Sequence, residues 1–246
     1  MQTFYLTDAG KVRSHNEDSV TIINNKNNEF VLAIADGMGG HKAGEVASSI
    51  AIEHVKDSFY KLDTMGTKDD AIEWLRKIVK EINDKIFKYA KNNPESKGLG
   101  TTLVIAIKTN DYILYGNIGD SRGYVIKNNT LYQVTKDHTY VGMLITNGRL
   151  TAESAKNHPG KNLLTRALGA NDPIEIDIFD VDTSVKGLFL CSDGLTSMLT
   201  DEQIEKIINS NLRVEDVVTK LIKKANSRGG SDNISVAYLQ KESGEL

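Results

Sequence analysis

Three apolar segments of the chain each end at an aspartate that is followed by a small residue. The segments FVLAIAD, YGNIGD and LFLCSD end at Asp36, Asp120 and Asp193. Their lengths and β-branched content predict buried strands. A single acid in such a place can be an ordinary turn former. Three of them constrain the fold, because a sheet that brings these strand ends to one edge also brings the carboxylates together.

Other acids stand at the beginnings of two further predicted strands. Glu17 and Asp18 stand at the start of DSVTII, and Asp232 comes just before ISVAYL. Like charges in one site repel and raise one another's pKa values. Divalent cations relieve that repulsion, and carboxylate oxygens suit Mg²⁺, Mn²⁺ or Ca²⁺. Zinc is disfavoured, because the chain has one cysteine and no two histidines four residues apart.

The remaining pattern predicts an antiparallel sheet with helices packed on it. Two long stretches have apolar residues at i, i+4 spacing and predict helices over 46–62 and 72–90. The order of elements is not a regular β–α–β alternation, which favours antiparallel strands. Region 139–172 has no long apolar stripe and is expected to be a surface insertion. The predicted strands are 3–8, 18–23, 30–35, 102–107, 112–118, 123–127, 131–135, 174–181, 187–192 and 234–239, and two more helices are predicted over 200–208 and 214–225.

The composition is that of an ordinary globular protein. The 246 residues, of which 39% are hydrophobic and 26% charged, fit a single domain over 1–246. A net charge of −3 gives no sign of a nucleic-acid partner, and no apolar run is long enough for membrane insertion. The start, MQTFYLTDAGK, lacks the layout of a secretion signal, and the one cysteine, Cys191, fits a reducing compartment. We therefore expect a cytoplasmic protein.

Arg13 lies just before the acidic pair Glu17 and Asp18. Its guanidinium fork matches two phosphate oxygens, so beside bound cations it is a candidate phosphate clamp. The alternative is a structural ion pair with one of those two acids. Metal ions together with an arginine indicate phosphoryl chemistry at a two-metal site.

Seven motifs resemble, in order, those of the metal-dependent Ser/Thr protein phosphatases, known as the PPM or type 2C family. The resemblance implies an α+β fold, a four-layer α/β/β/α sandwich of two antiparallel sheets flanked by helix pairs. It also implies hydrolysis of phosphoserine and phosphothreonine in proteins by a hydroxide that bridges two Mn²⁺ or Mg²⁺ ions. The motifs are RSHNED, DGMGGHKAGEVAS, GLGTT, GDSRGYV, LTRALG, CSDGLT and SDNISV.

The motif match also implies a set of metal ligands. Asp36 would bridge the two ions, and Gly37 would bind one of them through its carbonyl. Asp193 and Asp232 would complete the protein ligands of the first ion. Glu17 would help to hold the second ion, partly through water.

Further roles follow from the same resemblance. Asp120 and Asp193 would hold a third, weaker ion of the kind found in bacterial members. Asp18 would orient Arg13, which would bind the substrate phosphate, and 139–172 would form a flap beside the cleft. The compact form is similar to the single-domain bacterial phosphatases that oppose PASTA-type Ser/Thr kinases, so the expected partners are such a kinase and its phosphorylated substrates, and a monomer is expected.

The general acid is less clearly marked. Many eukaryotic members of the family have a histidine two residues after the bridging aspartate, where this chain has Met38. His41 ends the DGMGGH motif and is the natural substitute, because a histidine with a near-neutral pKa can protonate a leaving seryl oxygen. His41 could equally cap the helix that starts near Lys42. His15 also lies close to the clamp.

Three alternative functions are less well supported by the sequence than a metal-dependent phosphatase. GDSRG (119–123) matches the nucleophile elbow of serine hydrolases, but that motif needs a helix directly after the serine, and GYVIK predicts a strand. A cysteine-based phosphatase needs an arginine six residues after Cys191, where Ser197 stands. A metal-bound pseudophosphatase that only binds phosphoproteins would lack a metal ligand, and none of the ligand positions, Glu17, Asp36, Asp193 and Asp232, is missing, which favours an enzyme.

Overall fold

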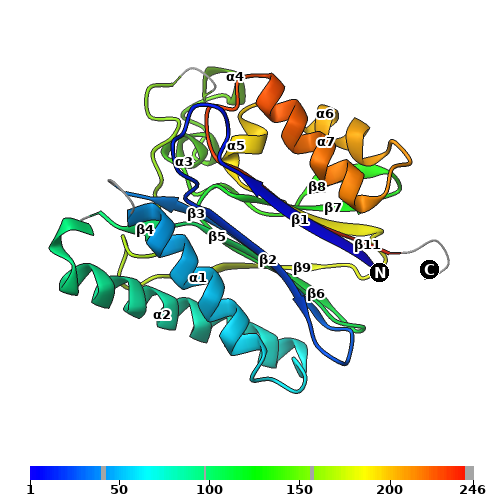
Figure 1. Ribbon diagram of the computed structural model, residues 1–246, viewed down its shortest axis with the longest axis horizontal. Helices are drawn as coiled ribbons and strands as arrows, with labels where there is room; N and C mark the ends of the chain where they lie inside the picture. The colour runs from blue at the N-terminus through cyan, green and yellow to red at the C-terminus, as the bar shows by residue number, and fades with distance from the viewer. Residues whose placement is uncertain (40–42, 97, 156–157, 242–246) are drawn as a thin grey trace.

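Two antiparallel sheets lie face to face in the computed structural model of the chain, which describes residues 1–39, 43–96, 98–155 and 158–241 (Figure 1). The first sheet has the order β1 (Gln2–Asp8), β11 (Ile234–Gln240), β10 (Gly187–Cys191), β7 (Arg122–Lys127) and β8 (Thr130–Gln133). The second has the order β2 (Asp18–Asn24), β3 (Phe30–Met38), β5 (Leu103–Lys108), β6 (Ile113–Ile118) and β9 (Asp177–Val181), and the short strand β4 (Gly100–Thr101) pairs with β3.

Helices cover the outer face of each sheet (Figure 1). The long helices α1 (Ala43–Phe59) and α2 (Lys68–Asn92) pack on the second sheet, and α6 (Asp201–Ile208) and α7 (Val214–Ser227) pack on the first. The one-turn helix α5 (Asp193–Thr196) follows β10, a short 3₁₀ turn covers Pro94–Ser96, and α3 (Tyr140–Thr146) and α4 (Ala152–Ala155) lie in the predicted insertion.

Three apolar layers separate these four layers of secondary structure. In β3, Leu32 and Ile34 face the opposite sheet, whereas Val31 and Ala33 face α1 and α2. Because both faces of the strand are covered, the sequence is a continuous apolar run rather than an alternation. The predicted four-layer sandwich is therefore confirmed.

The element boundaries differ from the predictions in a few places. A capping box of Thr67 and Asp70 starts α2 four residues before the first predicted position, and the capping box of Thr200 and Gln203 opens α6. The strand predicted over 174–181 begins only at Asp177, and neither β4 nor α5 was predicted. A strand, β7, follows the GDSRG serine, which excludes a nucleophile elbow. Within the described ranges, none of the helices combines the length and apolar character needed to span a bilayer.

The direction of the strands explains where the acids meet. Strands β3 and β6 both run antiparallel to β5, so Asp36 near the end of β3 and Asp120 after β6 lie at the same edge. Strand β2 runs antiparallel to β3, and Asp18 at its start pairs with Asp36. In the other sheet β11 runs antiparallel to β10, so Asp232 lies near Asp193. Acids that follow strands and acids that precede them are thus brought to one end of the sandwich.

The layer between the two sheets should dominate stability. Leu32 is fully buried there, and Leu32→Ala should lower the free energy of unfolding by about 2–5 kcal/mol because it leaves a cavity. Urea denaturation measures the change. Leu212→Ala, at an exposed position, is the matched control and should change stability by less than about 0.5 kcal/mol. Equal losses in the two variants would contradict this assignment of the core.

Candidate active site

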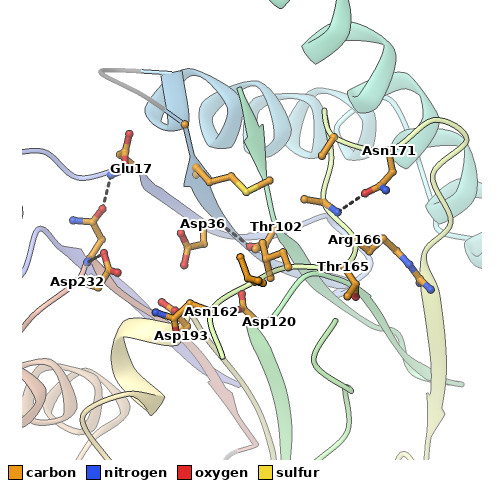
Figure 2. Close-up of a pocket in the computed structure, with 18 of the residues that line it drawn as sticks. Glu17, Asp36, Thr102, Asp120, Asn162, Thr165, Arg166, Asn171, Asp193 and Asp232 are labelled. Carbon is orange, nitrogen blue, oxygen red and sulfur yellow. Dashed lines mark hydrogen bonds between the residues drawn. The ribbon is translucent and has the colours of Figure 1, made fainter. Parts of the chain in front are cut away.

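A pocket of about 520 Å³ opens at the end of the sandwich where the acids meet (Figure 2). It is lined by residues of both sheets and by the return segment of the insertion, 162–171. Asp18 lies buried beside the pocket rather than in its lining, and His41 lies outside the described residues. The sequence-predicted residues in the lining are Arg13, Glu17, Asp36, Gly37, Asp120, Asp193 and Asp232.

The backbone of Asp36 is held on both sides by two threonines. The Asp36 amide donates to Thr102 Oγ1 at 2.9 Å, and the Asp36 carbonyl accepts from Thr101 Oγ1 and from the Thr102 amide, each at 2.9 Å. Thr102 Oγ1 is itself paired with the buried Ser121 hydroxyl at 2.9 Å. The motif GLGTT carried the family resemblance without a role for any residue. The structure shows that its threonines fix the position of Asp36.

Asn233 ties the loop that carries Arg13 and Glu17 to the other end of the chain. Its Oδ1 accepts from the Glu17 amide at 2.8 Å, and its Nδ2 donates to the carbonyls of His15 and Ala9 at 2.8 and 2.9 Å. Three bonds from one amide side chain satisfy most of its capacity, so the loop has little freedom to move.

Arg13 and Asp18 do not make the contact that the resemblance implied. Arg13 Nη2 lies 2.8 Å from Asp232 Oδ2, and Asp18 Oδ2 instead accepts from Ser192 Oγ at 2.7 Å. The two expected partners of Arg13, Glu17 and Asp18, are thus replaced by Asp232. Both members of this pair are partly exposed, so the pair contributes little to stability and its guanidinium is accessible to another anion.

The glycines beside Asp36 are required by close approach of three backbone segments. A Cβ atom on Gly37 would lie 2.1 Å from the Gly44 carbonyl oxygen and 2.6 Å from that of Glu17. A Cβ atom on Gly44 would lie 2.7 Å from Glu17 Oε1. Side chains at these positions would therefore push the Glu17 loop away from Asp36.

Burial and mutual repulsion perturb the acids strongly. Burial raises the pKa of Asp36 well above its usual value, and the neighbouring charges of Asp18 and Asp193 raise it further. Burial also raises the pKa of Asp18 and the pKa of Asp120 to about 7. The pKa of Asp193 is raised by burial first and by Asp232 second. The pocket thus concentrates carboxylates that resist ionisation together.

The donor chemistry of the pocket fits hard divalent cations. Glu17 Oε1 and Asp18 Oδ1 are buried without a hydrogen-bond partner in the part of the chain that the structure describes. Orphaned buried acceptors are rare and call for a cation or an ordered water. The ligands on offer are oxygens, and Mg²⁺ and Mn²⁺ prefer oxygen ligands.

The acids do not form a closed cage around one point. Across residues 1–39, 43–96, 98–155 and 158–241, no three His, Cys, Asp or Glu side chains are placed to hold a single ion. One reason is that Asp232 turns its Oδ2 towards Arg13. The implied ligand set of Asp36, Asp193 and Asp232 therefore needs a rotation of Asp232 or bridging waters, several of which Mg²⁺ usually keeps.

The far wall of the pocket is formed by residues for which no role was predicted. Thr165, Arg166 and Asn171 of the insertion line it (Figure 2), and Arg166 Nη1 lies 2.5 Å from Asp177 Oδ1. The motif LTRALG contains Thr165 and Arg166, so it marked this part of the chain. Nothing in the sequence indicated that Asp177, on β9, would be the partner of Arg166.

Comparisons with known proteins agree with this geometry. The family model described as Protein phosphatase 2C matches residues 9–236. The serine/threonine phosphatase stp of Listeria welshimeri is 42% identical over 98% of this chain and 96% of its own, and protein phosphatase PhpP of Streptococcus pneumoniae is 36% identical over 97% of each. Among solved structures, the serine/threonine phosphatase of S. agalactiae has a TM-score of 0.93 at 33% identity over 98% of this chain and 99% of its own. PstP/Ppp of Mycobacterium tuberculosis has a TM-score of 0.87 at 34% identity over the same shares.

The raised pKa of Asp120 predicts how stability depends on pH in the presence of EDTA. Between about pH 4 and pH 7 the folded protein keeps a proton on Asp120 that the unfolded chain has released. This contribution to stability is fully present below pH 4 and is lost as the pH rises through about 7. Denaturant unfolding from pH 5.5 to 8 should therefore show a steeper loss for the wild type than for Asp120→Asn.

The comparison of the two proteins reports on Asp120 and on the groups coupled to it, because the Asp120 charge also raises the pKa of Asp36. His138 has a lowered pKa and acts in the opposite direction, but it is common to both. The difference in slope should be at most about 1.4 kcal/mol per pH unit. Parallel curves for the wild type and Asp120→Asn would show that Asp120 titrates normally.

Proposed function

The chain belongs to the protein phosphatase 2C family and is a protein serine/threonine phosphatase, and we propose that its reaction takes place at a pair of Mn²⁺ or Mg²⁺ ions held in the acidic pocket. The observation that carries the proposal is the cluster of carboxylates with raised pKa values, in which Glu17 Oε1 and Asp18 Oδ1 are buried without a partner among the described residues. A cluster of this kind is costly unless positive charge enters it.

The residues that would hold the ions are those that line the pocket. Asp36 would bridge them, with the Gly37 carbonyl, Asp193, Asp232 and Glu17 as further ligands, directly or through water. When bound, the two ions would lower the pKa of a water to give a hydroxide nucleophile and would neutralise charge on the transferred phosphoryl group. Asp120 with Asp193 would provide a third, weaker position.

Arg13 would receive the substrate phosphate. Its guanidinium lies at the pocket, is half exposed, and within the described ranges is held by Asp232. A phosphate could replace that carboxylate and accept two parallel hydrogen bonds. Once Asp232 is released from Arg13 it can turn towards the ions, so phosphate binding and completion of the ligand set would favour each other.

The remaining parts of the proposal come from the resemblance. His41 is proposed as the general acid that protonates the leaving seryl or threonyl oxygen, with His15 as the other candidate. Residues 1–246 would form one catalytic domain, with 139–172 as the flap. The protein would act as a monomer in the cytoplasm on proteins phosphorylated by a PASTA-type kinase.

Turnover of p-nitrophenyl phosphate tests the metal dependence. Added Mn²⁺ should support activity and EDTA should abolish it. Asp193→Asn should reduce kcat/KM by at least about 1,000-fold, because the carboxylate is proposed as a ligand to more than one ion. Asp182→Asn, which removes an exposed partner of Lys127, is the control and should keep normal activity. Activity that is indifferent to EDTA would refute the metal mechanism, and no activity with Mn²⁺ would favour a phosphoprotein-binding pseudophosphatase.

Arg13→Ala tests the phosphate clamp. If the guanidinium binds phosphate equally in the ground state and the transition state, KM for a phosphothreonine peptide should rise about tenfold or more while kcat changes little. Steady-state kinetics at saturating Mn²⁺ separates the two. Arg213→Ala, an exposed arginine paired with Asp216, should leave both constants unchanged. A loss confined to kcat would place Arg13 in transition-state stabilisation instead.

A further inference from the structure

The turn that carries Asp120 crosses from one sheet to the other. It leaves β6 of the second sheet at Ile118 and enters β7 of the first sheet at Arg122. Strands β6 and β7 do not pair with each other, so no hairpin ladder fixes the turn. Gly119 adopts φ +102°, which side chains rarely allow, and a Cβ atom there would lie 2.5 Å from Thr102 Cγ2. Contacts from outside the turn therefore help to set the orientation of Asp120.

His138 provides two of those contacts, beside one from Asn117 to the Gly119 carbonyl and one from Thr102 to Ser121. Its Nδ1 accepts from the Gly119 amide at 3.1 Å, and its own amide donates to the Gly119 carbonyl at 2.9 Å. Its carbonyl accepts from the amide of Thr165, a residue of the pocket wall, at 2.8 Å. The residue is buried. One histidine thus joins the Asp120 turn to the insertion.

The tautomer of His138 follows from these bonds. The Gly119 amide can only donate, so Nδ1 must be unprotonated and the ring proton of the neutral form lies on Nε2. Nε2 lies 3.1 Å from Asp177 Oδ2, and the other oxygen of Asp177 accepts from Arg166. Asp177 therefore keeps the ring in the form that can accept from Gly119, a role familiar from residues that orient histidines around metal sites.

We propose that His138 is a positioning residue: by accepting the Gly119 amide proton, with its tautomer fixed by Asp177, it holds Asp120 in the orientation in which its carboxylate serves the weaker cation position. The inference rests on the proposed function for the identity of the ligand, a Mn²⁺ or Mg²⁺ ion. It assigns a role to buried His138 and its partly exposed partner Asp177, both of which lie outside the pocket lining. The catalytic ions themselves would not depend on it.

Two substitutions distinguish the roles of the two ring nitrogens of His138. In His138→Asn the amide oxygen can take the place of Nδ1 and accept from Gly119, while the contact with Asp177 is lost. In His138→Gln the amide nitrogen can take the place of Nε2 and donate to Asp177, while the acceptor for Gly119 is lost. Both variants lose the imidazole, and the smaller asparagine leaves the larger cavity, so a general packing defect would affect His138→Asn at least as much as His138→Gln. Circular dichroism and thermal unfolding show whether each variant is folded.

Binding of Mn²⁺ by titration calorimetry is the first measurement. His138→Gln should weaken the weakest Mn²⁺ site by about 10-fold or more and leave the tighter sites within about 3-fold, whereas His138→Asn should resemble the wild type. Equal effects of the two variants, or a wild type without a weak site, would overturn the proposal. A wild type that binds no Mn²⁺ and has no phosphatase activity would instead refute the proposed function.

Exchange of the Gly119 amide with solvent is the second measurement and needs no metal. Ile118–Gly119 is the one Ile–Gly pair in the sequence, so carbonyl labelling of isoleucine with ¹⁵N-glycine selects this amide in an NMR spectrum. Exchange should be slow in the wild type and in His138→Asn, and about tenfold faster in His138→Gln, because one hydrogen bond is lost. Unchanged exchange in His138→Gln would refute the positioning bond.

Discussion

Everything at the functional end of this protein depends on keeping mutually repelling carboxylates close together in a poorly solvated place. Alternating strand directions in two sheets deliver acids from both the starts and the ends of strands to one edge. Burial then makes each negative charge expensive, as the raised pKa values show. In the proposed function, the same arrangement that is unfavourable for the isolated chain would give affinity for small, highly charged cations and, through them, for phosphate.

The carboxylates stay close together because neighbouring groups hold them, or the backbone that carries them, by hydrogen bonds. Thr101 and Thr102 hold the backbone of Asp36, Ser192 holds Asp18, and Asn233 holds the loop of Glu17. These are neutral hydrogen-bonding groups, so they restrain the acids without cancelling their charge. Arg13, by contrast, is cationic and partly exposed, and in the proposed function its bond to Asp232 would be exchanged for a bond to substrate.

Much of the fold could be predicted from the sequence because strands buried on both faces are continuous apolar runs, such as FVLAIA. The positions of the acids relative to those runs also indicated the site. Contacts between residues that are far apart in the sequence could not be predicted, because they depend on how the chain folds. Arg13 selects Asp232, which is 219 residues away, over the nearby Glu17 and Asp18. Strand β4 forms only because β3 offers it an edge, and the first residues of the predicted strand 174–181 pack their isoleucines against the helices instead of pairing. No local sequence pattern indicates that Asp177 connects Arg166 to His138.

The side chain of Asn233 forms hydrogen bonds with residues 9, 15 and 17, which lie 216 or more positions earlier in the chain. Asp232 and Asn233 reach the pocket only when the last strand has docked between β1 and β10. During synthesis on the ribosome, the complete pocket can therefore form only when nearly all of the polypeptide has emerged. A nascent chain that ends before residue 232 lacks both a proposed metal ligand and the side chain that holds the Glu17 loop.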